Sequence, residues 1–271
     1  MSVVVVSHER RDALKRCLAS IEKSVERARL QVIVVDNGST DGSARLDDEF
    51  PAAQFIRLPK NFGLTKAMNI GWRAAAAEYV LFLHDDTDLE PDSVCLLAGV
   101  LDATPDATAV CPLLVDAQGR PAPQLGSLPP DGQWRPAEIG AGTAGNQPFA
   151  VEYPRGAALM ARVFFIKAIR HIDERYGQFG GDAELAAQIR RASRKILLVP
   201  AARVRHQGRQ AYTAEERADF LLGRAAYLRK HHGFGAGLRA RMASVLGPLT
   251  QFRLGELKYT LAGQKIDGAA R

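Results

Sequence analysis

Short apolar runs alternate with amphipathic helical patterns over the first hundred residues of the chain. Runs of apolar strand formers occur at residues 3–6, 32–35, 54–58 and 79–83. Apolar residues recur with helical spacing over residues 10–28 and 64–77. Because strands and helices follow one another in this order, the strands are predicted to pair in parallel through right-handed crossovers. The pattern predicts an α/β fold with a Rossmann-like, mostly parallel central sheet flanked by helices, whose ligands bind at the carboxyl ends of the strands.

After residue 115 the sequence pattern changes twice, first to a segment rich in proline and glycine and later to a basic helical segment. Residues 116–154 hold many of the prolines and glycines, which predicts a long loop that could close over a bound substrate. Strands are predicted again at residues 196–199 and 202–205, ahead of a basic segment with helical spacing. We therefore expect an α/β domain over residues 1–210 and a basic, helical C-terminal extension over residues 211–271.

Composition narrows the class of protein. Hydrophobic residues make up 46% of the 271 residues, which is enough for a large core. No stretch approaches the roughly 18 to 20 apolar residues that span a bilayer, and the first residues resemble a strand, not a signal peptide. The three scattered cysteines indicate buried thiols in a reducing compartment. We expect a cytoplasmic protein that is soluble or peripheral at the inner face of a membrane.

The formal net charge of +6 suits nucleic acid, an anionic membrane surface or phosphorylated ligands. From Arg217 onward, arginines and lysines are spaced through apolar helical segments. Such a tail can lie on anionic lipid, although most such helices pack on their own domain with a solvated basic face. The tail predicts peripheral contact with an anionic membrane as an alternative to simple packing, and no nucleic-acid partner is expected.

The strand at residues 79–83 ends abruptly in a cluster of acids. Its apolar residues are followed by His84, Asp85 and Asp86, and Asp88 comes two residues later. A buried strand that delivers carboxylates to its carboxyl end is where an α/β sheet holds a metal or a phosphate. The sequence therefore predicts a metal or phosphate site at this strand end.

Other candidate ligands follow the second strand and begin the next helix. Asp36 ends the strand at residues 32–35, where its carboxylate could accept a hydrogen bond from a base imide N–H. Lys60, Asn61 and Lys66 lie near a helix start and could meet a phosphate or a nucleoside, or they could serve only the packing of that helix. A Gly-x-Gly-x-x-Gly turn does not follow the first strand, which argues against a dinucleotide-binding dehydrogenase.

Two further residues have both a structural and a functional interpretation. Asp182 follows a glycine-rich turn at a predicted helix start, where it could cap the helix or act as a general base if it opens to a cleft. His206 follows the predicted strand at residues 202–205. A histidine in such a place is more often an ordinary strand-end residue than a ligand.

Taken together, these motifs resemble those of a known enzyme family. The ordered set comprises Val3–Arg10, Val34–Ser43, Asn61 to Gly63 with Asn69 to Gly71, the acidic strand end, Gly156 with Ala157, Asp173 to Arg175, Gly181 with Asp182, and His206. The set is similar to that of family 2 glycosyltransferases with the GT-A fold, and most similar to their rhamnosyltransferase-like branch. The resemblance covers about residues 2 to 210 and leaves the tail outside.

The resemblance implies an inverting transfer of a sugar from a nucleoside diphosphate donor, either a dTDP- or a UDP-sugar, to a hydroxyl acceptor. The preferred prediction is L-rhamnose as the transferred sugar, with dTDP-rhamnose as its donor. By the same resemblance, Asp36 binds the base, the turn of Ser7, His8 and Glu9 lines the nucleoside pocket, and the loop at residues 116–154 lies on the acceptor side.

The resemblance also implies a divalent metal, Mg²⁺ or Mn²⁺. The family's Asp-x-Asp motif falls on His84, Asp85 and Asp86 when Pro91 is aligned with the family's downstream proline, so that Asp86 is the retained metal-binding acid. An alternative frame uses Asp86 and Asp88 but displaces the proline. His206 matches a histidine that often supplies another ligand, and its nitrogen would favour Mn²⁺ over Mg²⁺.

The family's general base corresponds to Asp182. The family commonly has Glu at the preceding position, where this chain has Gly181, so a helper carboxylate is either absent or supplied by Glu184. Two other hypotheses remain open. The departures at His84 and Gly181 are compatible with a degenerate nucleotide-sugar-binding protein, and an α/β sheet with acidic metal ligands is compatible with a nucleotidyltransferase. The sequence does not identify the acceptor.

Overall fold

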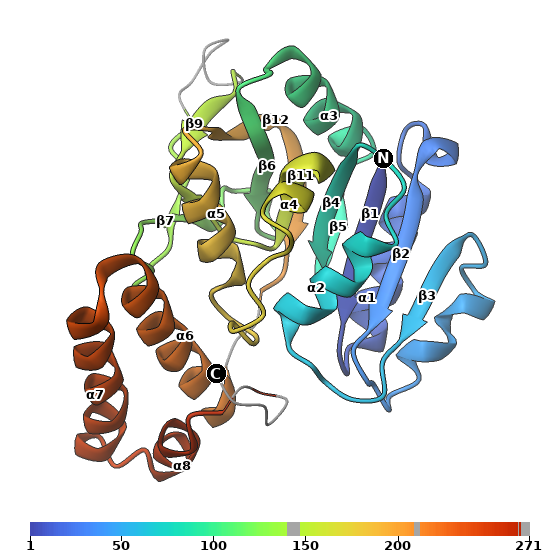
Figure 1. Ribbon diagram of the computed structural model, residues 1–271. Helices are drawn as coiled ribbons and strands as arrows, with labels where there is room; N and C mark the ends of the chain where they lie inside the picture. Colours follow the sequence, from blue (N-terminus) through green and yellow to red (C-terminus); the bar gives the residue numbers. More distant parts are fainter. Residues whose placement is uncertain (140–146, 209–211, 265, 267–271) are drawn as a thin grey trace.

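One curled sheet forms the centre of the molecule (Figure 1). The computed structural model describes residues 1–139, 147–208, 212–264 and 266. The strands of this sheet are β1 (Ser2–Ser7), β2 (Gln31–Asp36), β3 (Ala53–Arg57), β4 (Tyr79–His84), β5 (Thr87–Leu89), β6 (Ala107–Val115), β9 (Phe149–Val151), β11 (Ala158–Arg162) and β12 (Lys195–His206). The helices that accompany it are α1 (Arg11–Glu22), α2 (Leu64–Arg73), α3 (Ser93–Ala103), α4 (Val163–Ala168) and α5 (Gly181–Arg191), with short 3₁₀ helices η1 (Arg27–Arg29) and η2 (Ser43–Asp48).

The order of the strands is β3-β2-β1-β4-β11-β6-β12-β5, and β9 pairs with β12. The first four strands in this order are parallel, which confirms the predicted parallel pairing. The other half is mixed, because β11 enters between β4 and β6 and runs antiparallel to both. The α/β class is confirmed, and the parallel arrangement holds for the half that carries the N-terminal motifs.

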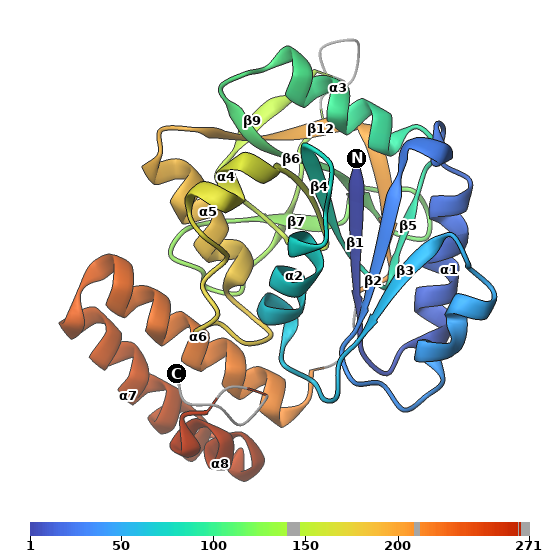
Figure 2. The same ribbon diagram turned by 45° about the vertical axis from the view of Figure 1, so that its right-hand side comes forward.

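Helices cover both faces of the sheet (Figure 2). The strand β1 is buried on both sides: Val3 and Val5 belong to one apolar cluster, with α1 and α3, while Val4 and Val6 belong to another, with α2, α4 and α5. A continuous apolar run is typical of a parallel strand covered on both faces. This packing leaves the strand ends as the place where polar side chains can gather.

Residues 116–154 are more ordered than the predicted long loop. They include β7 (Pro123–Gly126), β8 (Arg135–Pro136) and β10 (Tyr153–Pro154), which form a second sheet in the order β10-β7-β8. The buried side chain of Gln124 accepts a hydrogen bond from Leu114 N and donates one to Pro112 O, which fixes β7 to β6. The loop prediction was wrong here because these contacts are between side chain and backbone, and they leave no periodic signal. Residues 140–146 lie outside the described part.

The two strands predicted at residues 196–199 and 202–205 form one strand. β12 is continuous from Lys195 to His206, with an irregularity in its pairing to β6 between Val199 and Arg203. Its last residues pair with β5, a short strand that the apolar pattern did not indicate. This pairing brings His206 beside Thr87, directly after the acidic end of β4.

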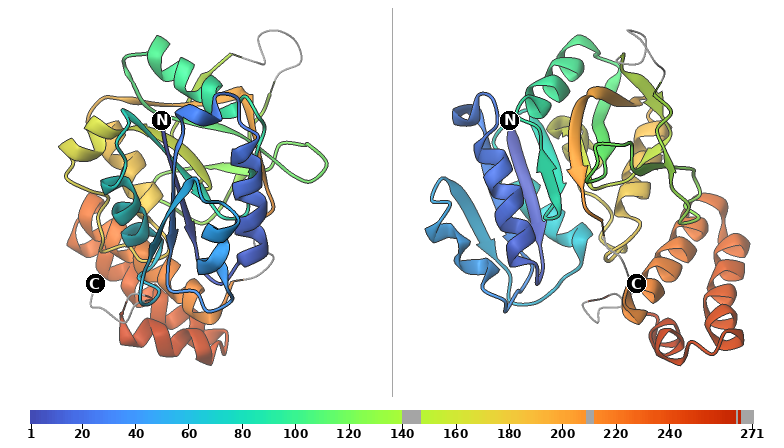
Figure 3. Two further views of the ribbon diagram at one scale, coloured as in Figure 1. Left: turned by 90° about the vertical axis from the view of Figure 1, so that its right-hand side faces the viewer. Right: turned by 180° about the vertical axis from the view of Figure 1, so that it is seen from behind.

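Three helices follow the sheet: α6 (Ala214–His232), α7 (Phe234–Thr250) and α8 (Leu254–Ala262) (Figure 3). A capping box of Thr213 and Glu216 begins α6. Asp219 accepts hydrogen bonds from two backbone amides before α5, and Lys230 lies 2.7 Å from carboxylate oxygens of both Asp173 and Glu184. The C-terminal helices are therefore bonded to the α/β part. Within the described residues, none of the helices has the length and apolar character of a membrane span.

Candidate active site

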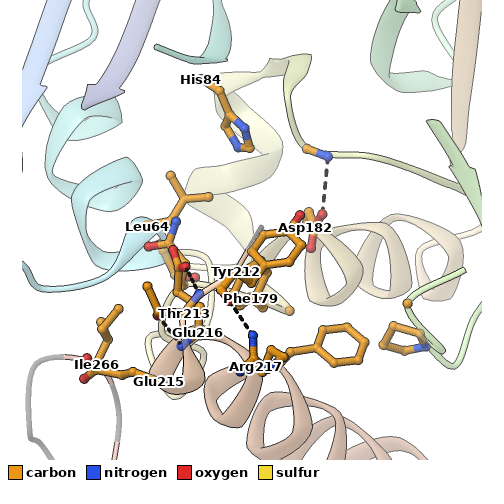
Figure 4. A pocket seen from close by; sticks show the side chains of 18 of the residues that line it. Leu64, His84, Phe179, Asp182, Tyr212, Thr213, Glu215, Glu216, Arg217 and Ile266 are labelled. Atoms are coloured by element: carbon orange, nitrogen blue, oxygen red, sulfur yellow. Dashed lines mark hydrogen bonds between the residues drawn. The ribbon is translucent and has the colours of Figure 1, made fainter. Parts of the chain in front are cut away.

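A cavity of about 910 Å³ opens at the carboxyl ends of β1 and β4. We call it the cleft. Its walls include the turn after β1, the end of β4, the start of α5 and residues of the C-terminal helices. Figure 4 shows His84 and Asp182 projecting toward this cleft from different elements. The register explains the gathering, because Val6 of β1 lies beside His84 and Ser7 lies beside Asp36.

The end of β4 brings together the imidazoles of His84 and His206 and the carboxylate of Asp86. One ligand atom from each lies within 4.8 Å of the others. Nε2 of His206 is 3.4 Å from Oδ1 of Asp86, and both side chains are almost fully buried. The strand β12 delivers His206 to this place because it pairs with β5.

Arg10 lies between the two acids that follow His84. Its Nη1 donates to Oδ1 of Asp85 at 3.2 Å and to Oδ2 of Asp86 at 3.0 Å. Oδ2 of Asp85 also accepts a hydrogen bond from Ser7 Oγ at 2.9 Å. Burial alone would raise the pKa of Asp86, but the nearby imidazoles of His206 and His84 and the guanidinium of Arg10 hold that pKa well below its usual range. Asp86 is therefore a carboxylate anion.

The donor set at the end of β4 fits a divalent cation. The buried Oδ1 of Asp86 accepts no hydrogen bond of good geometry from the described residues, and it points to the group of His84 and His206. One carboxylate oxygen and two imidazole nitrogens suit Mn²⁺ better than Mg²⁺, which prefers oxygen ligands throughout. Asp85 is occupied by Ser7 and Arg10, and Asp88 is absent from the lining of the cleft.

The turn of Ser7, His8 and Glu9 lines the cleft, as does Asn61. Glu9 adopts a left-handed backbone conformation, with φ of 52°, and its Oε1 accepts hydrogen bonds from the backbone amide and the hydroxyl of Thr40. The turn after β1 is thereby fixed to the turn after β2. Asn61 Oδ1 accepts hydrogen bonds from Asn37 and from the backbone amide of Gly63, so its side chain shapes the start of α2.

Asp36 is buried at the end of β2. Its Oδ2 accepts a long hydrogen bond from the backbone amide of Ser39, and its Oδ1 accepts none from the described residues. Burial raises the pKa of this carboxyl. The next residue, Asn37, lines the cleft, whereas Asp36 itself does not. A buried acceptor without a donor costs free energy, so this oxygen is suited to receive a donor from a ligand.

Lys60 and Lys66 are not brought to the cleft. Both ammonium groups lie over the ring of Phe62, at 5.4 and 4.3 Å from its centroid. Neither lysine is among the residues that line the cavity. Their helix-start position alone therefore does not place them at the phosphate side of the site.

Asp182 lies in the first turn of α5 and lines the cleft. Its Oδ1 accepts a hydrogen bond from Ala183 N at 2.8 Å, its Oδ2 accepts one from Gly156 N at 3.3 Å, and the hydroxyl of Tyr153 donates to the same carboxylate. Burial of the carboxylate raises its pKa, and these three donors partly counter the effect. The side chain remains partly exposed, so it combines a raised pKa with access to the cleft.

The carboxylate of Glu184 binds residues outside the cleft. It is buried against Tyr176, Lys230 and His231, with oxygen distances of 3.0, 2.7 and 2.7 Å. The side chain faces the junction of α5 and α6 and is absent from the lining of the cleft. The idea that Glu184 supplies a helper carboxylate was therefore wrong, because on an α-helix its side chain points away from that of Asp182 two residues earlier.

Several residues of the cleft were missed by the sequence patterns. Arg10 follows the first strand. Its place beside Asp85 and Asp86 could have been expected, because two consecutive buried acids need a cation nearby. Tyr153 had no signal, since it lies in a segment rich in proline and glycine. The same holds for an aromatic wall on the side of the cleft near Asp182. Its residues are Trp134, Phe179, Tyr212 and Phe220.

Two curated proteins are similar to parts of this chain in sequence. Over 233 residues the chain is 25% identical to the N-acetylglucosaminyl-diphospho-decaprenol L-rhamnosyltransferase of Mycobacterium tuberculosis, an alignment that covers 76% of this chain and 75% of that protein. Over 91 residues it is 40% identical to an N-acetylglucosaminyltransferase of Sinorhizobium fredii, which covers 32% of this chain and 22% of that protein. This chain thus spans only about a fifth of the length of the second relative.

Solved structures share the fold. A crystal structure of GalNAc-T7 with UDP, GalNAc and Mn²⁺ matches with a TM-score of 0.71 at 17% identity, covering 96% of this chain and 55% of that one. The structure of residues 1–349 of S. aureus TarS in complex with UDP-GlcNAc matches with a TM-score of 0.62 at 16% identity, covering 95% and 72% of the two chains. The family model described as glycosyl transferase family 2 matches residues 2–165, which is more than half of the chain. The chain therefore belongs to glycosyl transferase family 2 and has the GT-A fold.

Proposed function

We propose that this protein transfers a sugar from a nucleoside diphosphate donor to a hydroxyl of an acceptor, with inversion at the anomeric carbon. The observation that carries the proposal is the pairing of two groups in one cleft: the donor set of Asp86, His84 and His206 on one side, and the carboxylate of Asp182 on another. Glycosyl transfer with inversion needs stabilisation of a leaving diphosphate and, on the opposite face of the sugar, a base for the acceptor hydroxyl.

On the donor side, Asp86 would hold a divalent cation, and His84 and His206 would complete the protein's share of its ligands. When bound, the cation would stabilise the negative charge that develops on the diphosphate as the glycosidic bond breaks. Arg10 supports this role, because it lines the cleft and forms ion pairs with both neighbouring acids. Its remaining N–H groups can donate to a diphosphate oxygen.

On the acceptor side, Asp182 would take the proton of the attacking hydroxyl. A raised pKa makes its carboxylate a stronger base than an exposed aspartate, and its exposure to the cleft allows contact with the hydroxyl. The backbone amides of Gly156 and Ala183 and the hydroxyl of Tyr153 orient the carboxylate. The aromatic wall defined above then offers flat surfaces for the acceptor.

The nucleoside would lie against the turns after β1 and β2. The buried Oδ1 of Asp36, which accepts no hydrogen bond from the described residues, could accept the imide N–H of a thymine or uracil base, and Ser7, His8 and Glu9 would line the nucleoside pocket. Both bases carry that imide, so the interaction is compatible with dTDP- and UDP-sugars alike. Similarity to the L-rhamnosyltransferase of M. tuberculosis favours L-rhamnose as the sugar, and dTDP-rhamnose is the donor that we propose for it. We further propose a hydroxyl of a glycan, a lipid-linked or a natural-product acceptor, and a cytoplasmic location.

A catalytically degenerate nucleotide-sugar-binding protein is the second candidate. It is favoured by His84 at the leading position of the metal motif and by Gly181 before Asp182, since neither side chain supplies the carboxylate that the motif calls for. We do not favour a nucleotidyltransferase. The turn after β1 reads Ser-His-Glu-Arg-Arg, without a glycine-rich phosphate loop, and the family match indicates glycosyl transfer.

The first prediction concerns the metal ligands. Asp86→Asn is expected to weaken Mn²⁺ binding at least a hundredfold, more than the loss of an outer hydrogen-bond partner costs, because it removes the anionic ligand. Titration calorimetry with MnCl₂ in the presence of dTDP measures the affinity. Asp88→Asn is the matched control, since that acid is absent from the lining of the cleft. If Asp88→Asn weakens binding and Asp86→Asn does not, the alternative frame of the motif is the correct one.

The second prediction concerns the base. Asp182→Asn is expected to lower kcat for transfer by roughly 10²- to 10⁴-fold, because the carboxamide cannot accept the proton of the hydroxyl. The affinity for the donor is expected to stay the same. Transfer is measured with a panel of labelled nucleotide sugars, among which dTDP-rhamnose is expected to be consumed by the parent protein in the presence of Mn²⁺.

Three outcomes decide between the candidates. Undiminished turnover by Asp182→Asn removes that residue from the role of base. Metal-dependent nucleotide binding by the parent protein without hydrolysis or transfer, over the whole panel of donors and acceptors, supports the degenerate binding protein. Equal consumption of dTDP-rhamnose and unrelated UDP-sugars contradicts the rhamnosyl assignment.

The third prediction concerns pH. The base acts as a carboxylate, so kcat/KM falls as the pH drops through the pKa of Asp182. Tyr153→Phe removes a donor that stabilises the carboxylate, so the pKa rises and the acid limb is expected to move up by about one pH unit. Tyr176→Phe removes an equivalent hydrogen bond, to Glu184 outside the cleft, and is expected to leave the limb in place. Equal shifts in both variants would show a general effect on the fold.

A further inference from the structure

One face of α7 exposes a row of large apolar side chains. Figures 1 and 3 show this helix on the far side of α6 from the central sheet. The row consists of Phe234, Leu238, Met242, Leu246 and Leu249, each between 48% and 67% exposed. We call this row the α7 stripe. Soluble surfaces scatter such residues singly, so a continuous row indicates a contact surface.

The spacing places the stripe on a single face. Successive members are four, four, four and three residues apart, and such positions lie next to each other on an α-helix. The opposite side of α7 is used differently: the buried Gly237, Ser244 and Pro248 face the rest of the structure. Phe252 and Leu254, which follow the helix, are 87% and 68% exposed and extend the apolar surface toward α8.

The surroundings of the stripe are basic. Between residues 220 and 264 the only acid is Glu256, which is buried and paired with Arg217 and Arg253. The same segment holds seven arginines and lysines, namely Arg224, Arg229, Lys230, Arg239, Arg241, Arg253 and Lys258. Arg239 and Lys258 are exposed, and Arg229 is stacked on the ring of Phe234 at 5.7 Å. Lys230 and Arg253 are paired with carboxylates, whereas the exposed Arg239 and Lys258 form no ion pair among the described residues. An apolar row with exposed cations on its own helix and on α8 matches a surface that is apolar inside and anionic outside.

We propose that the α7 stripe docks on an anionic lipid surface, with α7 lying in the plane of the interface. The apolar side chains would enter the boundary between headgroups and acyl chains, and the exposed cations would meet the lipid phosphates. Long arginine and lysine side chains can follow this geometry, because their stems cover apolar surface while their charged ends reach the headgroups.

A second copy of the chain fits this surface less well. A two-fold dimer sets the same patch against itself, so the cations around the stripe would face their own copies. Like charges at close range oppose association, and the segment offers no exposed acid to compensate them. Charge complementarity therefore favours lipid phosphate as the occupant.

The same helix connects this surface to the cleft. Ala243, Gly247 and Pro248 of α7 contribute to the wall of the cavity that holds Asp182. Docking through the stripe would thus hold the cleft beside the membrane surface. This placement would suit an acceptor carried by a lipid, although the docking itself can be measured without any donor or acceptor.

Vesicle co-sedimentation tests the proposal with the full chain. The parent protein is expected to bind phosphatidylglycerol-containing vesicles and to bind pure phosphatidylcholine vesicles at least tenfold more weakly. The triple variant Leu238→Gln/Met242→Gln/Leu246→Gln is expected to lose about a hundredfold in partitioning. Arg239→Gln/Lys258→Gln is expected to lose about fivefold for each charge, an effect that disappears at high salt.

The matched control replaces two equally exposed apolar residues outside the C-terminal helices. Val25→Gln/Phe164→Gln removes side chains that are 51% and 52% exposed and is expected to bind vesicles as the parent does. Circular dichroism checks that every variant is folded, which is expected because all the changed side chains are exposed. Equal binding by the parent and the triple variant, or equal binding to anionic and neutral vesicles, overturns the proposal. A concentration-dependent dimer in sedimentation velocity that the triple variant abolishes identifies a second copy as the occupant instead.

Discussion

Compensation of charge at the carboxyl end of β4 is the constraint on which the site depends. Two consecutive carboxylates, Asp85 and Asp86, are buried there, and buried anions are stable only when they are paired. Arg10 supplies the pairing from the turn after β1, and His206, at the end of β12, lies beside Asp86. Each partner comes from a different strand of the same sheet. The chemistry of the site therefore depends on the order and register of the strands, since a shift in register would separate the carboxylates from their partners.

Different parts of the fold carry the two sides of the cleft. The proposed donor side lies at strand ends of the central sheet, where Asp86 and His206 are buried. The proposed acceptor side lies on the start of α5 and on the small second sheet, which holds Tyr153 against Asp182. The C-terminal helices line another part of the cleft and carry the α7 stripe on their outer side. The cleft and the proposed surface contact thus share α7.

The fold was predicted from the sequence because apolar runs mark the strands. Asp86, Asp182 and His206 were singled out through the resemblance to family motifs, and all three line the cleft, while their roles stay predictions. Arg10 and Tyr153 were missed because their roles depend on contacts between distant segments: 75 and 76 residues separate Arg10 from its two acids, and Tyr153 reaches Asp182 only through the second sheet. That sheet was itself missed, since the buried side chain of Gln124 fixes it. Glu184, Lys60 and Lys66 lie near motifs in the sequence but do not line the cleft. A polar residue near a motif can thus contribute to the fold and not to the site.

The metal site can be tested by diffraction from crystals grown with Mn²⁺ and dTDP, recorded at the manganese absorption edge. We predict one anomalous peak within bonding distance of Asp86 and His206, with the diphosphate beside it and an open cleft between the diphosphate and Asp182. A diphosphate bound to Arg10 without a manganese peak would contradict the metal site, and a peak at Asp88 or outside the cleft would contradict the assignment of its ligands.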